Sequence, residues 1–182
     1  MGGKKNKNYP DGWFDYDPVK NEIPGVRLIP FKCPLPYRRF ITEDMQQHKW
    51  TPEDVMLRIP NIALVIDLTY KFPAYYEPNE FLDANIAYEK IGVVGHHVPS
   101  DECYYTFCDV VKNFVMRNSR NDLVIGVHCT HGVNRTGYMI CRYMVEKLRY
   151  KPGDALEEFA SSRGYPVERE NYRQAIYDAY KA

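Results

Sequence analysis

The feature that most constrains the fold is the stretch LVIGVHCTHGVNRTG, residues 123–137. Residues 123–128 form a mostly apolar, β-branched run, which is typical of a strand covered on both faces. After a short loop, residues 135–149 place apolar side chains at helical spacing. A buried strand that leads through a short loop into a helix is a building unit of α/β sheets.

The rest of the chain continues this alternation of strands and helices. Apolar runs at residues 62–68 and 86–94 predict two more strands, and residues 25–40 contain a short strand candidate interrupted by prolines. Further helices are expected at residues 52–59, from 100 onward, at 152–163 and at 169–182. We predict an α/β fold with a central, mostly parallel, twisted sheet flanked by helices. A flexible basic tail is expected at residues 1–9 and a single domain at 10–182.

The composition excludes several classes of protein. The 24 Lys and Arg residues balance the 24 Asp and Glu residues, so the chain lacks the bulk charge of a nucleic-acid binder. The five cysteines are odd in number and irregularly spaced, without a CxxC pair. This pattern favours a reducing, intracellular compartment and argues against a structural zinc site. No apolar run reaches the roughly 18 residues of a membrane span, so no membrane association is expected.

The loop after the strand carries the candidate chemistry. Cys129 ends the strand, and Arg135 and Thr136 open the helix in a Cys-x5-Arg-Thr spacing. Such a loop turns backbone N–H groups inward as an anion-binding nest, to which the helix N-terminus adds about half a positive charge. The pKa of Cys129 should then fall below its free value of about 8.5, giving a thiolate nucleophile for a phosphate that Arg135 clamps. We expect Gly132 to supply a positive φ or a close backbone approach, and Thr136 to donate to the sulfur.

Two alternative roles for Cys129 compete with that of a nucleophile. A buried structural cysteine is common, but it leaves the glycine and the arginine at these offsets without a purpose. A metal site of His128, Cys129 and His131 is awkward, because neighbouring strand residues point to opposite faces. We therefore predict no metal here. His128 is expected to be an orienting, hydrogen-bonded residue, and His131 to line the rim of the pocket.

The motif and several other stretches resemble one family. The loop is similar to the phosphate-binding loop of the cysteine-dependent dual-specificity phosphatase superfamily. Its HCTHGxNRTG form resembles the RNA 5′-phosphatase branch, which includes the triphosphatase domains of metazoan mRNA capping enzymes and the baculovirus RNA phosphatase. PFKCPL (30–35) and IDLTYKFPAYY (66–76) resemble elements of the same branch. VGHHVPSDE (94–102) and VERENY (167–172) look most like its RNA/RNP-complex-interacting subgroup. The resemblance covers roughly residues 10–180.

This resemblance implies a cysteine-phosphatase fold and removal of the γ and β phosphates of 5′-triphosphorylated RNA, leaving a 5′-monophosphate. It implies a cysteinyl-phosphate intermediate on Cys129, with neither a metal nor another cofactor. The phosphate-binding residues carried over by the resemblance are Thr130, His131, Gly132, Val133, Asn134 and Arg135. The expected partners are RNA with a 5′-triphosphate or 5′-diphosphate and an RNA-processing protein complex. We expect a monomer inside the cell, mainly nuclear, with a cytoplasmic pool.

The loop before the helix at residue 100 lacks an expected acid. Compact tyrosine phosphatases place a general-acid Asp about 32 residues before the cysteine, and His97 occupies that position here. A phenol, with a pKa of about 10, benefits from a proton donor as it leaves, whereas a phosphate anhydride needs one less. The departure therefore favours RNA ends over phosphotyrosine. Asp101 is a candidate acid if the loop moves, or a helix N-terminal acid stabilised by the dipole.

Other charged residues are weaker candidates. Asp67, at the end of an apolar strand, could orient Arg135 or a loop amide, act in the second step, or cap a loop. Lys32 and Arg169 are candidates for binding the outer phosphates or the RNA backbone, and each could equally form a surface ion pair. Arg142 is expected to have a structural partner, because a charge near the core needs one.

Two alternative functions stay open from the residues. The first is a dual-specificity protein or lipid phosphatase of the same fold. The second is a non-catalytic RNA-end-binding module, against which the intact Cys129, Arg135 and Thr136 argue. The Lys-x-Asp-Gly motif of a guanylyltransferase does not occur in the sequence.

Overall fold

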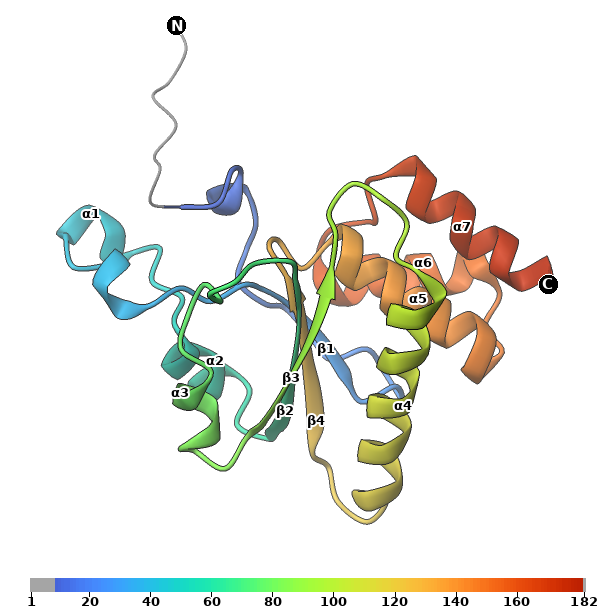
Figure 1. Cartoon of the computed structure of the whole chain (residues 1–182), viewed down its shortest axis with the longest axis horizontal. Coiled ribbons are helices and arrows are strands. Elements are labelled where there is room, and N and C mark those ends of the chain that lie inside the picture. The colour runs from blue at the N-terminus through green and yellow to red at the C-terminus, as the bar shows by residue number, and fades with distance from the viewer. Residues whose placement is uncertain (1–8, 182) are drawn as a thin grey trace, which may run out of the picture.

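A sheet of four parallel strands organises the chain (Figure 1). The computed structural model describes residues 9–181. The spatial order is β1-β4-β2-β3, and every neighbouring pair is parallel, which confirms the predicted α/β class. The strands are β1 (Leu28–Lys32), β2 (Ile62–Thr69), β3 (Ala87–Val93) and β4 (Val124–Cys129). The basic tail predicted at residues 1–9 lies, except for Tyr9, outside the described residues.

Helices cover both faces of the sheet (Figure 1). One face carries the short helices α2 (Pro52–Arg58) and α3 (Asn79–Leu82), with α1 (Glu43–Gln46) further out. The other face carries the long helices α4 (Asp101–Arg117), α5 (Asn134–Leu148), α6 (Pro152–Arg163) and α7 (Glu170–Lys181). Two 3-10 turns, Trp13–Asp15 and Tyr37–Arg39, complete the described elements. Within residues 9–181, no helix has the length and apolar character needed to span a bilayer.

Local signals fix the helix ends near the predicted positions. Thr51 and Asp54 form a capping box at the start of α2, with Pro52 as its first residue, where the missing N–H of proline is not needed. The hydroxyl of Ser100 accepts from the amide of Cys103 at the start of α4. Gly164 ends α6 with a φ of 87°, a conformation that glycine adopts without steric cost.

Two buried clusters hold the two layers to the sheet, and β4 contributes to both. Ile125, Val127 and Cys129 belong to the cluster beneath the long helices. The ring of His128 faces the other side, where it lies 5.1 Å from Phe31 and 5.6 Å from Tyr76. Neighbours 128 and 129 therefore lie on opposite faces, as the strand geometry predicts.

Candidate active site

A pocket opens where β4 passes into α5. Because β4 lies between β1 and β2, the loop of residues 130–133 emerges at the middle of the carboxyl edge of the sheet. This is the edge at which open α/β sheets bind ligands. The pocket has a volume of about 250 Å³ and is lined by Pro10, Asp11, Tyr75, Gly95, His96, Cys129, Thr130, His131, Asn134, Arg135, Arg169 and Tyr172.

Cys129 lies at the base of this pocket and is 3% exposed. Burial alone would raise the pKa of its thiol. The Arg135 guanidinium, the hydroxyl and amide of Thr136 and the amide of Gly132 outweigh burial and hold the pKa below its ordinary value. The Thr136 hydroxyl is itself buried, without another hydrogen-bond partner in the described part of the chain, so a thiolate is the acceptor that it lacks. The position of Cys129 suits a nucleophile.

Arg135 is held at the pocket by backbone carbonyls. Its Nη1 donates to the carbonyl of Val93 at 2.9 Å and more weakly to that of Leu68 at 3.4 Å. Its Nη2 donates to the Thr130 hydroxyl at 2.8 Å. The ends of β2 and β3, rather than the Asp67 carboxylate, therefore orient this guanidinium.

The loop is fastened from behind by Arg163, which the sequence reasoning did not single out. Arg163 is 0% exposed. Its Nε donates to the carbonyl of Gly132 at 3.1 Å, and its Nη2 donates to those of His131 at 2.9 Å and Asp17 at 2.7 Å. Because the carbonyls of Gly132 and His131 point to Arg163, the loop presents its N–H groups to the other side, the arrangement of an anion-binding nest. The only signal in the sequence was an arginine in the last turn of a helix.

Gly132 is required by the geometry of this loop. Its φ is +69°, and a Cβ built on it would lie 2.0 Å from the carbonyl oxygen of Phe31. The close approach that the sequence predicts is thus made to β1. Gly132, Val133 and Thr136 are not among the pocket-lining residues, and the last two are fully buried.

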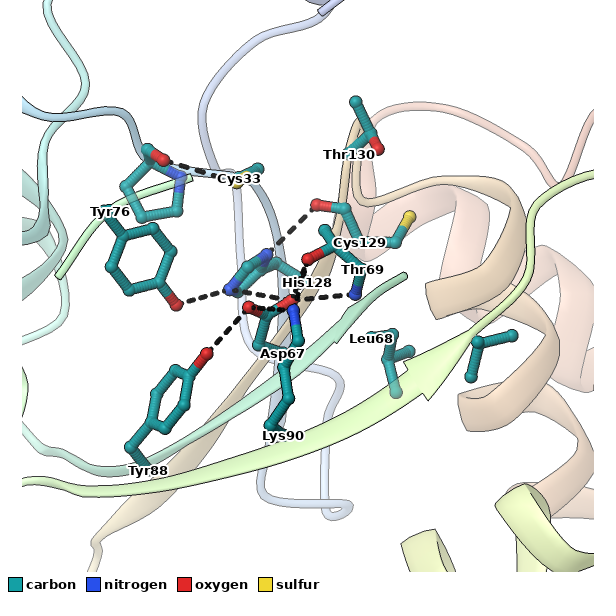
Figure 2. Close-up of polar contacts among 12 residues, drawn as sticks. Cys33, Asp67, Leu68, Thr69, Tyr76, Tyr88, Lys90, His128, Cys129 and Thr130 are labelled. Carbon is teal, nitrogen blue, oxygen red and sulfur yellow. Dashed lines mark hydrogen bonds and ion pairs between the residues drawn. The ribbon is translucent and has the colours of Figure 1, made fainter. Parts of the chain in front are cut away.

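A buried polar network lies on the opposite side of β4 from the Cys129 sulfur (Figure 2). Asp67 accepts hydrogen bonds from Tyr88 Oη and Lys90 Nζ, each at 2.8 Å, and from Thr69. His128 bonds through Nε2 to Tyr76 Oη at 2.7 Å, and its Nδ1 lies 3.0 Å from the carbonyl of Cys129. Burial lowers the pKa of His128, and the ring is hydrogen-bonded, as predicted.

Asp67 is therefore the centre of a structural network and not a pocket residue. It is 0% exposed. Burial raises its pKa, but His128, Lys90 and the Thr69 hydroxyl outweigh burial and keep the pKa below its usual value. Of the alternative roles expected for Asp67, the contact with Arg135 is not made, because Lys90, Tyr88 and Thr69 occupy both carboxylate oxygens. The loop-cap role is confirmed, because the amide of Thr69 donates to Asp67 at 2.7 Å.

One wall of the pocket comes from the two ends of the described chain. The ring of His131 stacks on Tyr16 with centroids 4.9 Å apart, and its Nε2 lies 2.7 Å from the carbonyl of Asp11. The Asn134 side chain accepts from the amides of Glu168 and Arg169 at 3.0 and 2.9 Å. Asn134 thereby brings Arg169 to the pocket, where its guanidinium has no ion-pair partner among residues 9–181.

Lys32 does not belong to this pocket, so its predicted contact with the outer phosphates or the RNA backbone is wrong. It is 3% exposed, and its Nζ donates to the carbonyls of Trp13 and Tyr16 at 3.2 and 2.8 Å. The same ammonium lies 3.6 Å from the centre of the Trp13 ring. Burial, followed by the charge of Arg163, lowers the pKa of Lys32 to about 8. Lys32 fastens the N-terminal segment to β1.

Asp101 forms an ion pair outside the pocket. It pairs with Arg142 Nη1 at 2.7 Å and is not among the residues that line the pocket. Arg142 also pairs with Glu146 and lies 3.9 Å over the ring of Tyr104, so the predicted structural pairing of Arg142 is confirmed. The loop before α4 contributes Gly95 and His96 to the pocket, but not His97.

The side chains of His128 and Cys129 do not converge on one point, as ligands of a shared metal ion would. His128 faces away from the sulfur across β4 (Figure 2). In the described part of the chain, no three His, Cys, Asp or Glu side chains are grouped to hold a metal ion.

A buried low-pKa cysteine at the carboxyl end of a central strand, below an arginine-bearing loop, defines a cysteine-based phosphatase site. The sequence matches the dual specificity phosphatase catalytic domain over residues 46–182. The chain belongs to the dual specificity phosphatase family.

Two relatives are similar to this chain over nearly its whole length. The mouse RNA/RNP complex-1-interacting phosphatase is 43% identical over 174 residues, covering 93% of this chain. This chain spans about half of that relative's length (53%). A tyrosine-protein phosphatase of Autographa californica nuclear polyhedrosis virus is 38% identical over 168 residues, covering 92% of this chain and 98% of the viral protein.

Solved structures share the fold at low sequence identity. The crystal structure of Tk-PTP in the active form superposes with a TM-score of 0.66 at 14% identity, covering 90% of this chain and 97% of that one. PTPMT1 in complex with PI(5)P superposes with a TM-score of 0.65 at 16% identity, covering 90% and 95%. These similarities confirm the predicted cysteine-phosphatase fold.

Proposed function

We propose that this protein removes the γ and β phosphates from the 5′ end of triphosphorylated RNA, through a cysteinyl-phosphate intermediate and without a metal. The observation that carries the proposal is the loop before α4. It gives the pocket His96 and no carboxylate, while Asp101 is held by Arg142. A leaving phosphate anhydride tolerates this arrangement better than a leaving phenol does.

The first step uses the pocket as it stands. The Cys129 thiolate attacks the γ phosphorus in line, a sulfur–phosphorus bond forms, and the bond from phosphorus to the bridging oxygen breaks. The electron pair leaves with the RNA 5′-diphosphate. The inward N–H groups of the loop and the Arg135 guanidinium stabilise the charge on the equatorial oxygens.

The second step releases inorganic phosphate. A water molecule attacks the phosphorus, the sulfur–phosphorus bond breaks, and the water proton passes to the departing phosphate. The Thr136 hydroxyl, buried beside the sulfur, stabilises the returning thiolate. The same cycle on the 5′-diphosphate then leaves a monophosphate.

The walls of the pocket suit a chain of phosphates. While the loop holds one phosphoryl group, the guanidinium of Arg169 stands in the wall without an ion-pair partner among residues 9–181. Arginine is well matched to phosphate oxygens. We include in the proposal that Arg169 binds the phosphates next to the one under attack.

The proposal extends to the cellular setting. The relatives' name refers to an RNA/RNP complex, which supports an RNA substrate and an RNA-processing protein complex as partners. A monomer with an intracellular, mainly nuclear location is part of the same proposal and derives from the sequence alone.

The decisive experiment follows both phosphates on RNA labelled separately at the γ and β positions. We expect release of both labels, and a higher kcat/KM on this RNA than on a phosphotyrosine peptide. Cys129→Ser should abolish release, whereas Cys103→Ser, outside the pocket, should not. A preference for the peptide would contradict the proposal, as would equal activity of Cys129→Ser.

One observation favours a protein phosphatase as the second candidate. Asp11, from the N-terminal segment, supplies the one carboxylic side chain among the pocket-lining residues described. If Asp11 protonates a phenol, Asp11→Asn will reduce kcat on a phosphotyrosine peptide by about 10²-fold. The RNA proposal instead predicts that Asp11→Asn leaves kcat on triphosphorylated RNA within about threefold.

A further inference from the structure

The loop that follows β2 exposes aromatic rings and reaches the pocket at its far end. Residues 70–75 read Tyr-Lys-Phe-Pro-Ala-Tyr, without an acid, and we name them the aromatic loop. Tyr70 is 64% exposed and Phe72 is 76% exposed, whereas Tyr75 at the far end lines the pocket. Large rings gathered in one short exposed segment indicate a contact surface.

Two buried anchors hold the aromatic loop in place. On one side the hydroxyl of Thr69, which is 1% exposed, donates to Asp67 at 2.7 Å. On the other side Tyr76, which is 2% exposed, bonds to His128 at 2.7 Å. Both anchors belong to the network beneath the nucleophile (Figure 2). Both ends of the aromatic loop are therefore held in place relative to Cys129.

The rings are supported and lie close to positive charge. A Cβ added to Gly92 would lie 3.3 Å from the ring of Tyr70, so this ring rests on the backbone of β3. Lys90 Nζ lies 5.4 Å from the centre of the Phe72 ring, and Lys71 Nζ lies 4.8 Å from that of Tyr75. Proteins bind single-stranded nucleic acid with this combination of stacking rings and nearby cations.

We propose that the aromatic loop is the stacking surface for the first nucleobases of the RNA. Tyr70 and Phe72 provide the rings, and Lys71 contacts the phosphodiester between the bases. The inference rests on the function proposed above and specifies its substrate as a single-stranded 5′ end, because paired bases do not offer their faces to side chains. Tyr75 joins this surface to the pocket.

The test compares two substrates that share the phosphates but not the bases. One is a triphosphorylated single-stranded oligoribonucleotide, and the other is inorganic tripolyphosphate. Phe72→Ala should raise KM for the oligonucleotide about five- to twentyfold, the lower range for loss of one base–aromatic contact. We expect kcat on the oligonucleotide and KM for tripolyphosphate to stay within about twofold. Tyr70→Ala should behave alike, and Phe72→Trp should retain the native KM.

The matched control is Tyr180→Ala, since Tyr180 is an exposed ring (55%) near the end of α7, outside the pocket. It should leave kcat and KM for both substrates unchanged. An unchanged KM for the oligonucleotide in Phe72→Ala and Tyr70→Ala would overturn the inference. So would an equal rise for tripolyphosphate, because the loss would not depend on the bases. If the unmodified protein releases no phosphate from the RNA, the proposed function itself fails, and that result needs no variant.

Discussion

The guanidinium of Arg163 is buried, charged and bonded to the loop of residues 130–133 without entering the pocket. It donates to the carbonyls of Gly132, His131 and Asp17. Arg163→Met keeps most of the apolar volume but leaves these carbonyls without their donor. The loop is then no longer held with its N–H groups toward the pocket. Both the stability of the fold and the activity should therefore fall.

The size of the stability loss follows from two opposing contributions. A hydrogen bond to a charged group contributes about 1.5–3 kcal/mol, and Arg163 makes three. Burial opposes them, because it lowers the pKa of Arg163 to about 10, which corresponds to roughly 3 kcal/mol. The free energy of unfolding should therefore fall by about 1.5–6 kcal/mol. A domain with a stability of about 5–15 kcal/mol survives most of that range, so the variant can be assayed at low temperature.

The effect on activity should exceed the effect on stability. Losing one preorganised donor to a transition-state oxygen costs about 10²–10³ in kcat, and the reoriented loop loses at least one. The pKa of Cys129 should rise as well, which the pH dependence of alkylation by iodoacetate measures without any substrate. Urea unfolding gives the stability in parallel.

Arg27→Met is the matched control for Arg163→Met. Arg27 also donates to backbone carbonyls, those of Leu123 and Asn118, but at the opposite end of the sheet. It should lose stability while its kcat/KM stays within about twofold. The reasoning is refuted if Arg163→Met keeps kcat/KM within threefold and an unshifted alkylation profile.

Three further outcomes are expected. Gly132→Ala should lower the free energy of unfolding by about 3 kcal/mol or more, because its Cβ would lie 2.0 Å from the carbonyl oxygen of Phe31. Gly25→Ala has a similar positive φ but open space around it, so it should lose only about 1 kcal/mol. Thermal unfolding of the two variants tests this difference, and equal losses would contradict it. Asp67→Asn should lose about 3–5 kcal/mol at pH 7. Because the folded pKa of Asp67 is depressed, its contribution is present above the unfolded pKa of about 3.9 and is lost as the pH falls through the folded pKa. Urea unfolding from pH 3 to 7 should therefore show the gap closing at low pH, and a constant gap would argue against an ionised Asp67. Asp101→Asn should leave kcat on RNA within about twofold, since this carboxylate is bonded to Arg142; a loss of 10²-fold would restore it as a general acid.

The parts of the site that could be predicted are those made by neighbours in the chain. A β-branched run, a glycine and an arginine at fixed offsets determine where Cys129 ends its strand and where α5 begins, so the strand, loop and helix were predictable from residues 123–137. The opposite orientations of His128 and Cys129 follow from the period of a strand. These inferences need no knowledge of distant segments.

The residues that escaped prediction owe their roles to distant partners. Arg163 reaches Gly132 and Asp17 across 31 and 146 positions of the chain. Asp67 accepts hydrogen bonds from Lys90 and Tyr88 of the neighbouring strand, and the periodicity of the sequence does not reveal this pairing. The sequence around Lys32 does not reveal that its ammonium is enclosed by the Trp13 ring and the Tyr16 carbonyl.

The N-terminal segment has a consequence for how this protein can be divided. The family match begins at residue 46, yet the edge strand β1 and the Asp17 carbonyl that holds Arg163 both precede it. A polypeptide cut to residues 46–182 would lack one edge of the sheet and one wall of the pocket. The region that the family model matches is thus smaller than the unit that must fold together, and a truncation that preserves activity has to retain the segment that carries Asp17 and β1.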